Sequence, residues 1–364
     1  MDGRAREWLQ RGSFFDWTPG AQAGAHGPLK IFHAEFGDPG ADALVLVHGF
    51  PTSSIDWFDV IEPLSGEYRV CLLDFPGFGF SDKPRGAQYG LAPDAELLEH
   101  YAARVLGLSS VAVVAHDRGD SVALELVARC ALGAGELELN HLVITNGNVF
   151  LPLSSLTEFQ RLVLNASSAP QVLAALTPEM LAAGMGASTF TPPRTPDDPA
   201  IAALAHTFAY NDGVSVLHDT IQYLVERSTN ERKWLDALAD SPVATAIVWG
   251  LYDTVSPLRV AAHVWERHVA SKRGENEFWL LPAANHYLQH DQPDEFAAVV
   301  LRFLQVRSPQ APGPLSAAAG APILLDRSRS ELPSAESVLA ATAQLEDLQG
   351  AGAGPTRPAD GLDS

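Results

Sequence analysis

Ser110-Val-Ala-Val-Val-Ala-His-Asp-Arg-Gly119 decides the fold, because it joins an apolar strand to a sharp turn with an aspartate at its tip. The residues that follow, 121–130, have the apolar spacing of a helix. A strand-turn-helix of this kind is strained and requires small residues two positions before and after the tip, where Ala115 and Gly119 stand. The pattern predicts a nucleophile elbow with Asp117 as the nucleophile. The alternative is that Asp117 only caps the helix, since aspartate is a favoured N-cap residue.

Two later segments supply an acid and a histidine. Residues 244–250 form an apolar run that predicts a buried strand, and Asp253 follows it. Residues 277–281 predict the last strand of the sheet, and His286 lies between it and a final amphipathic helix. The chain order of nucleophile, acid and histidine is that of a hydrolytic triad at one edge of a parallel sheet. We therefore expect Asp117, Asp253 and His286 to meet in space.

The turn after the strand at 44–47 predicts further parts of the site. Its backbone N–H at Phe50, together with that of Arg118 after the nucleophile, is expected to form an oxyanion hole. Trp57, shortly after this turn, is expected to contact substrate. The glycine-rich segment 76–84 lacks the Lys-Ser/Thr of a P-loop, so no phosphate cradle is predicted there.

These stretches carry a resemblance to a known family. The chain resembles an α/β hydrolase of the epoxide hydrolase and haloalkane dehalogenase branch, and it is most similar to the mesoderm-specific transcript protein group. The motifs that carry the resemblance span most of the chain: His48-Gly-Phe-Pro-Thr-Ser-Ser54, Gly77-Phe-Gly-Phe-Ser-Asp-Lys-Pro84, His116-Asp117, Asn211-Asp-Gly213 and His286-Tyr287. The resemblance implies the α/β-hydrolase fold, a mostly parallel, doubly wound sheet with an inserted helical cap. It does not imply a particular substrate.

The distribution of strand-like and helix-like segments predicts the domain organisation. The middle of the chain is helix-rich and proline-punctuated, while the last part is rich in Ala, Pro, Gly and Ser and cannot bury enough apolar surface to fold. One short helix is possible in it, at Ser334–Leu348. The predicted parts are an N-terminal extension (1–28), the α/β-hydrolase core (29–150 and 241–307), a helical cap (151–240) and a disordered tail (308–364).

Composition restricts the partners. The formal charge of −20 disfavours binding to nucleic acid or to anionic membranes. Neither a signal peptide nor an apolar run long enough for a transmembrane segment is found, so a cytoplasmic location is expected. The two cysteines, Cys71 and Cys130, give no disulfide framework and no metal-ligand spacing. We expect a small-molecule substrate and neither cofactor nor metal; the composition does not indicate an oligomeric state.

An aspartate nucleophile implies chemistry in two steps. A carboxylate is already ionised above about pH 4 and attacks without a general base, which leaves an ester on the enzyme. His286 is then expected to activate water to hydrolyse this ester, with Asp253 orienting the ring.

The first step leaves three functions open. Epoxide opening needs an acidic donor for the departing oxygen, and Tyr223 and Tyr210 are the candidates from the cap, whose first half contains no tyrosine. Dehalogenation is the second. Arg118 could bind the carboxylate of a haloacid, although pairing with Asp120 is the structural alternative. Haloalkane dehalogenases usually have a tryptophan directly after the nucleophile, where this chain has Arg118. A non-catalytic binding protein is the third.

Two asparagines follow the strand that ends near residue 145. Asn146 and Asn148 are predicted to line the pocket by hydrogen bonding. Asparagine cannot replace a carboxylate, which favours Asp253 as the triad acid.

Overall fold

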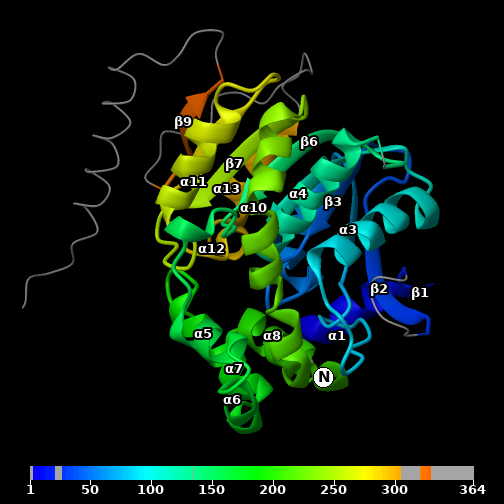
Figure 1. The fold of residues 1–364 in the computed structure, drawn as a ribbon, viewed down its shortest axis with the longest axis vertical. Helices are drawn as coiled ribbons and strands as arrows, with labels where there is room; N and C mark the ends of the chain where they lie inside the picture. Colours follow the sequence, from blue (N-terminus) through cyan, green and yellow to red (C-terminus); the bar gives the residue numbers. More distant parts are fainter. Residues whose placement is uncertain (1–2, 21–26, 134, 305–319, 329–364) are drawn as a thin grey trace, which may run out of the picture. The chain divides into compact units, whose positions relative to one another are not determined.

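The computed structural model describes residues 3–20, 27–133, 135–304 and 320–328, and a single nine-stranded sheet runs through them (Figure 1). Its strand order is β1-β2-β4-β3-β5-β6-β7-β8-β9. The strands are β1 (Ser13–Trp17), β2 (Leu29–Phe36), β3 (Ala43–Val47), β4 (Arg69–Leu73), β5 (Ser110–His116), β6 (Glu138–Thr145), β7 (Ala244–Gly250), β8 (Glu277–Leu281) and β9 (Ile323–Arg327).

The centre of the sheet is parallel and deeply buried. The strands from β4 to β8 pair in parallel, whereas β1, β2 and β9 are antiparallel to their neighbours. Every residue of β3 and of β7 is buried, as expected where helices cover both faces of a parallel sheet and the strands are continuous apolar runs. The predicted α/β-hydrolase fold is confirmed. The carboxyl ends of β5, β7 and β8 share one edge of the sheet, and this edge positions the site.

Both outer strands come from segments that the sequence analysis placed outside the core. β1 lies in the N-terminal extension and pairs with β2, and β9 lies in the predicted tail and pairs with β8. The prediction of disorder is wrong for residues 323–327. The apolar run of β9 is too short to stand out, but its backbone satisfies the free edge of β8. The helix predicted at Ser334–Leu348 lies outside the described residues.

Helices pack on the sheet between successive strands. Figure 1 shows α3, α4 and α10 beside one another, and α4 contacts β3, β5 and β6. The helical elements of the core are α1 (Gly3–Arg11), η2 (Ser54–Val60), α2 (Ile61–Ser65), α3 (Leu91–His100), η3 (Tyr101–Val105), α4 (Arg118–Ala131), α11 (Leu258–Val264), η6 (Trp265–Val269), α12 (Leu288–Asp291) and α13 (Pro293–Leu304).

Residues 151–240, between β6 and β7, are called the insert below and consist of helices joined by turns and irregular loops. Thr157, Thr177 and Asp198 each cap the start of one of its helices by accepting a backbone N–H, which explains where these helices begin. α5 to α8 gather beyond one end of the sheet, whereas α10 lies along α4 (Figure 1). The elements are η4 (Leu151–Leu153), α5 (Glu158–Leu164), α6 (Ala169–Ala175), α7 (Pro178–Ser188), α8 (Pro199–Ala209), η5 (Tyr210–Val216), α9 (Leu217–Thr220) and α10 (Tyr223–Asp240).

Candidate active site

Asp117 occupies a strained turn between β5 and α4. Its backbone has φ 53° and ψ −111°, in a region that residues with a side chain rarely adopt. Gly119 makes the turn sterically feasible, because a Cβ atom there would stand 2.5 Å from the carbonyl oxygen of Val47. The side chain of Asp117 does not cap α4. The geometry is therefore that of an elbow, and the alternative of a simple helix cap has no support.

The carboxylate of Asp117 is buried and only half satisfied. Its Oδ1 accepts a hydrogen bond from the backbone N–H of Phe50 at 2.9 Å. Its Oδ2 has no hydrogen-bond partner among the described residues and lies 3.8 Å from Nε2 of His286. An unpaired carboxylate oxygen at a buried site is costly and leaves a lone pair available to a ligand.

His286 is oriented by Asp253. The Nδ1 of His286 and Oδ2 of Asp253 are 2.9 Å apart, while Oδ1 of Asp253 accepts the backbone N–H groups of Val255 and Ser256 at 2.8 and 2.9 Å. Burial lowers the pKa of His286, but Asp253, by its charge and hydrogen bond, and the charge of Asp117 outweigh it and raise the pKa to about 9. The structure thus brings the three predicted triad residues together.

The loop that carries His286 is tied to the sheet by Asn146. The amide of Asn146 donates to the carbonyl oxygens of Asn285 and His286 at 2.8 and 3.0 Å, and its oxygen accepts the N–H of Gly250 at 2.9 Å. His116 also donates to the carbonyl oxygen of His286 at 2.8 Å. Asn146 therefore positions the histidine loop, and it does not line the cavity as predicted, because its amide groups are occupied by backbone.

The Phe50 loop is held by a buried neutral histidine. His48 donates from Nδ1 to the carbonyl oxygen of Gly49 at 2.9 Å and accepts the N–H of Phe75 on Nε2 at 3.1 Å. Burial lowers the pKa of His48 to about 3. This arrangement fixes the backbone that presents the Phe50 N–H to Asp117.

Arg118 does not face the site. Its side chain is fully buried and forms an ion pair with Asp94 of α3, and its guanidinium lies over the ring of Phe78 at 5.1 Å. The expected pairing with Asp120 is wrong, since Asp94 is the partner, and this pairing leaves binding of a substrate carboxylate by Arg118 without support. Asp120 instead accepts the backbone N–H of Thr145 at 3.1 Å.

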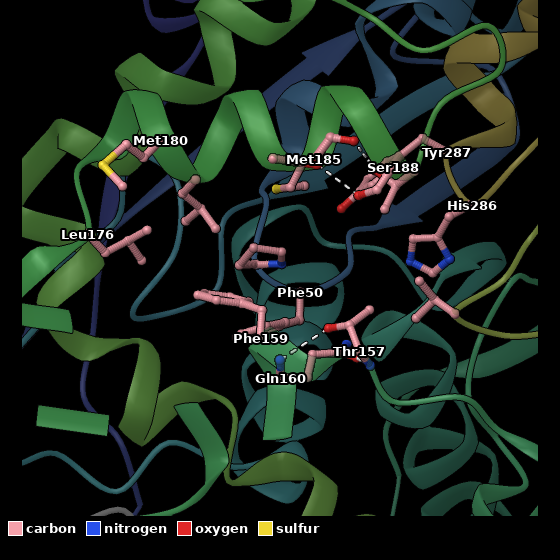
Figure 2. Close-up of a pocket in the computed structure, with 15 residues that line it drawn as sticks. Phe50, Thr157, Phe159, Gln160, Leu176, Met180, Met185, Ser188, His286 and Tyr287 are labelled. Atoms are coloured by element: carbon pink, nitrogen blue, oxygen red, sulfur yellow. Dashed lines mark hydrogen bonds between the residues drawn. The ribbon is translucent and has the colours of Figure 1, made fainter. Parts of the chain in front are cut away.

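An apolar cavity of about 250 Å³ lies between the insert and the sheet edge. Figure 2 shows Leu176 and Met180 at one end and His286 at the other. Its lining is Phe50, Pro51, Thr157, Phe159, Gln160, Leu176, Met180, Leu181, Gly184, Met185, Ser188, Thr189, Val255, His286 and Tyr287. No Asp, Glu, Lys or Arg side chain is among these described residues.

The tyrosines are arranged differently from the prediction. Tyr223 is buried with no hydrogen-bond partner for its hydroxyl among the described residues, and its ring packs 5.7 Å from that of Phe50. Burial, then the charge of Asp117, raises the pKa of Tyr223 above its usual value. Tyr210 does not line the cavity, because it packs against Phe80 and Lys83. Tyr287, which the sequence analysis did not select, lines the cavity beside His286.

Two other predicted contacts do not reach the cavity. Trp57 is fully buried against His116 and Phe296, with ring centroids 6.4 and 6.0 Å away. Asn148 is buried, and its carbonyl oxygen accepts a hydrogen bond from Arg227 at 2.9 Å. Arg227, on α10, is a residue of the site that sequence reasoning missed. A lone arginine in an amphipathic helix gives no signal of burial.

Among the described residues, no group of His, Cys, Asp or Glu side chains is arranged to hold a metal ion. Within the same ranges, no helix combines the length and apolar character needed to cross a bilayer.

The fold and the arrangement of the three residues define a hydrolase built on an α/β sheet. The model of the alpha/beta hydrolase family matches residues 44–299, and the chain belongs to this family. The resemblance stated from the motifs is thereby confirmed.

Relatives and solved structures agree with this assignment. The chain is 33% identical over 299 residues to LipZ of Mycobacterium tuberculosis, a proposed hydrolase, covering 82% of this chain and 97% of LipZ. It is 32% identical over 258 residues to the mesoderm-specific transcript homolog protein of Bos taurus, covering 69% of this chain and 73% of that protein. Haloalkane dehalogenase DbeA from Bradyrhizobium elkani has the same fold, with a TM-score of 0.65 and 20% identity over 79% of this chain and 96% of that one.

Proposed function

We propose that the protein hydrolyses epoxides through an ester of Asp117. One observation carries the proposal: in the elbow, Oδ2 of Asp117 has no hydrogen-bond partner within the described part of the chain and stands 3.8 Å from a histidine that Asp253 orients. A serine elbow would use this histidine to remove a proton from the nucleophile, whereas a carboxylate has none to lose. The insert serves as the cap over this site.

In the first step, Oδ2 of Asp117 attacks a ring carbon of the epoxide. A carbon–oxygen ester bond forms and the ring carbon–oxygen bond breaks, so the departing oxygen needs a proton. Tyr223 suits this role because its hydroxyl is buried, finds no partner among the residues that the structure describes, and is close enough to Asp117 to be affected by its charge. Tyr287 is the second candidate, since it lines the cavity and also interacts with the charge of Asp117.

In the second step, His286 takes a proton from water, which attacks the carbonyl carbon of the ester. The N–H groups of Phe50 and Arg118 stabilise the tetrahedral oxyanion. Its collapse breaks the bond to the substrate oxygen, which takes the proton of the re-formed carboxyl group, so the diol leaves and the carboxylate of Asp117 is restored. The proton held by His286 returns to the tyrosinate that the first step left. Esterification removes the negative charge of Asp117, which helps to raise the pKa of His286 in the free enzyme. The pKa of His286 therefore falls when the ester has formed, so more of the ring is neutral and able to accept a proton from water.

The surroundings favour an uncharged epoxide over a halogenated acid. The described lining offers no Lys or Arg side chain to a carboxylate, and Arg118 is already paired with Asp94. A haloalkane needs N–H donors for the leaving halide, but Trp57 is packed against His116 and Phe296. Neither Asp117 nor Tyr223 is among the lining residues, but both adjoin Phe50, which lines the cavity: its N–H binds Asp117 and its ring packs 5.7 Å from that of Tyr223.

Turnover of a defined substrate panel tests the proposal. Styrene-oxide-type epoxides, fluoroacetate and short chloroalkanes are incubated with the protein, and diol and halide are measured. We expect diol from the epoxides, loss of that activity in Asp117→Ala, and retention in the exposed control Asp236→Asn on α10. Halide release without diol formation would replace epoxide hydrolysis by dehalogenation, and epoxide turnover by Asp117→Ala would remove Asp117 as nucleophile.

A further inference from the structure

Arg227 is a buried cation that connects the insert to the nucleophile elbow. Its side chain is fully buried, and none of the ion pairs found among the described residues includes it. Its guanidinium donates to Oγ of Ser121 at 2.6 Å and to the carbonyl oxygens of Asn148 and Asp117 at 2.9 and 3.3 Å. One side chain from α10 thus contacts α4, the segment after β6 and the nucleophile itself.

A buried guanidinium without a direct carboxylate partner is expensive. Burial raises the pKa of the nearby Asp120 well above its usual value, and the charge of Arg227 opposes only part of this shift. The bonds of Arg227 to backbone carbonyls satisfy the donors in fixed directions, as the rigid fork of arginine allows. Lysine could supply the charge but not these separate directions.

The same side chain is a neighbour of Tyr223. Tyr223 and Arg227 are four residues apart on α10 and therefore lie on one face of the helix. The guanidinium carbon of Arg227 is 5.1 Å from the centroid of the Tyr223 ring, and Phe50 packs against the same ring at 5.7 Å. Tyr223 therefore lies between Arg227, which donates a hydrogen bond to the carbonyl oxygen of Asp117, and Phe50, whose N–H binds the Asp117 carboxylate.

We propose that Arg227 is a positioning residue for ring opening: it fixes α10 on the elbow and so sets the position of the Tyr223 hydroxyl relative to Oδ2 of Asp117. This inference rests on the proposed function of the site. Arg227 is not a substrate-binding residue, because its guanidinium is buried, does not line the cavity and donates to protein atoms.

A double-mutant cycle tests this role. Four proteins are compared: wild type, Tyr223→Phe, Arg227→Met and the double variant. Each is mixed with an epoxide, with enzyme in excess, and the rate of ester formation on Asp117 is measured separately from the rate of ester decay. We expect Arg227→Met to slow ester formation by roughly 10²-fold, the cost of misplacing a reacting group, and to change ester decay much less. In the Tyr223→Phe background, Arg227→Met should change the rate of ester formation by less than about threefold, because the effects of substituting two interacting residues are not additive. Equal factors in the two backgrounds would overturn the proposal.

Three further proteins separate positioning from folding. Ser121→Ala removes one acceptor of Arg227 and should slow ester formation severalfold, again only when Tyr223 is present; an equal loss in Tyr223→Phe contradicts the role. For ester formation, Arg227→Lys should recover less than half of the activation free energy that Arg227→Met loses. Full recovery would contradict the role, because a positive charge alone would then suffice. Arg232→Met removes an exposed arginine of the same helix and should behave as wild type.

The failure of this inference can be told apart from that of the proposed function. If wild type forms no ester with any epoxide, the proposed chemistry fails, and the crystal structure of Arg227→Met decides the positioning question. A Tyr223 ring displaced from Phe50 supports the role of Arg227, and an unmoved ring overturns it.

Discussion

Nε2 of His286 lies 3.8 Å from Oδ2 of Asp117, beyond hydrogen-bond distance, although both side chains are buried. A hydroxyl or thiol nucleophile requires its base within about 3 Å, because the base removes its proton. A carboxylate makes no such demand in the first step. A separation of this size suits a base that acts on a water molecule in the second step.

Replacing the histidine should therefore stop the reaction half-way. In His286→Gln, alkylation of Asp117 continues but hydrolysis of the ester does not, so the enzyme should accumulate a covalent adduct. Mass spectrometry of the digested protein should place the added mass on the peptide that contains Asp117. His206→Gln, which changes a histidine of α8 outside the cavity lining, is the control and should accumulate none. An adduct on another residue would remove Asp117 from its role.

The tyrosines should affect ring opening but not ester hydrolysis. Tyr223→Phe removes the proton donor and should slow ester formation by roughly 10²-fold, within the range for a positioned acid. Tyr287→Phe should have a smaller effect if Tyr223 is the principal donor. Pre-steady-state measurements with a terminal epoxide distinguish the two steps. Unchanged ester formation in Tyr223→Phe, with a large loss in Tyr287→Phe, would transfer the role to Tyr287.

Ester decay should accelerate as the pH rises. Asp253 and Asp117 together raise the pKa of His286 to about 9 in the free enzyme, and only the neutral ring accepts a proton from water. Esterification removes the charge of Asp117, so the apparent pKa for ester decay should lie below 9. The rate constant for decay, measured in single turnovers between pH 6 and 10, should rise and then level off. A rate that falls with pH over this range would show that the protonated histidine is the active form.

Much of the site could be predicted because the triad residues follow strands. Asp117, Asp253 and His286 each come after an apolar run, and parallel strands bring their carboxyl ends to one edge. The pairing of Arg118 with Asp94 could not be predicted, because the two residues are 24 positions apart and the sequence between them gives no periodic signal of contact. The burial of Arg227 depends on how α10 packs on α4, which is a tertiary property. The side chain of Asn146 was predicted to line the pocket because an amide can hydrogen-bond a substrate. In the structure it donates instead to backbone carbonyl oxygens of the His286 loop.

Asn146 should contribute to stability as well as to activity. Asn146→Ala removes the partner of the N–H of Gly250 and of the carbonyl oxygen of Asn285, whereas the carbonyl oxygen of His286 keeps its bond from His116. Each unsatisfied group costs about 1–3 kcal/mol, so the free energy of unfolding should fall by at least about 2 kcal/mol. Urea denaturation measures this loss. Asn230→Ala, which removes an amide bonded only to its own helix, should change stability by less than about 0.5 kcal/mol. Equal stability of the two variants would mean that Asn146 does not hold the loop.

A single turnover in ¹⁸O-water tests the central claim, that Asp117 is the nucleophile, most directly. With enzyme in excess over epoxide, the oxygen delivered to the product comes from the side chain of Asp117, and the oxygen of water enters Asp117 when the ester is hydrolysed. We predict an unlabelled diol and a heavier Asp117 peptide. Labelled diol with an unlabelled peptide would contradict the account, because water would then have attacked the substrate directly and Asp117 would act as a base.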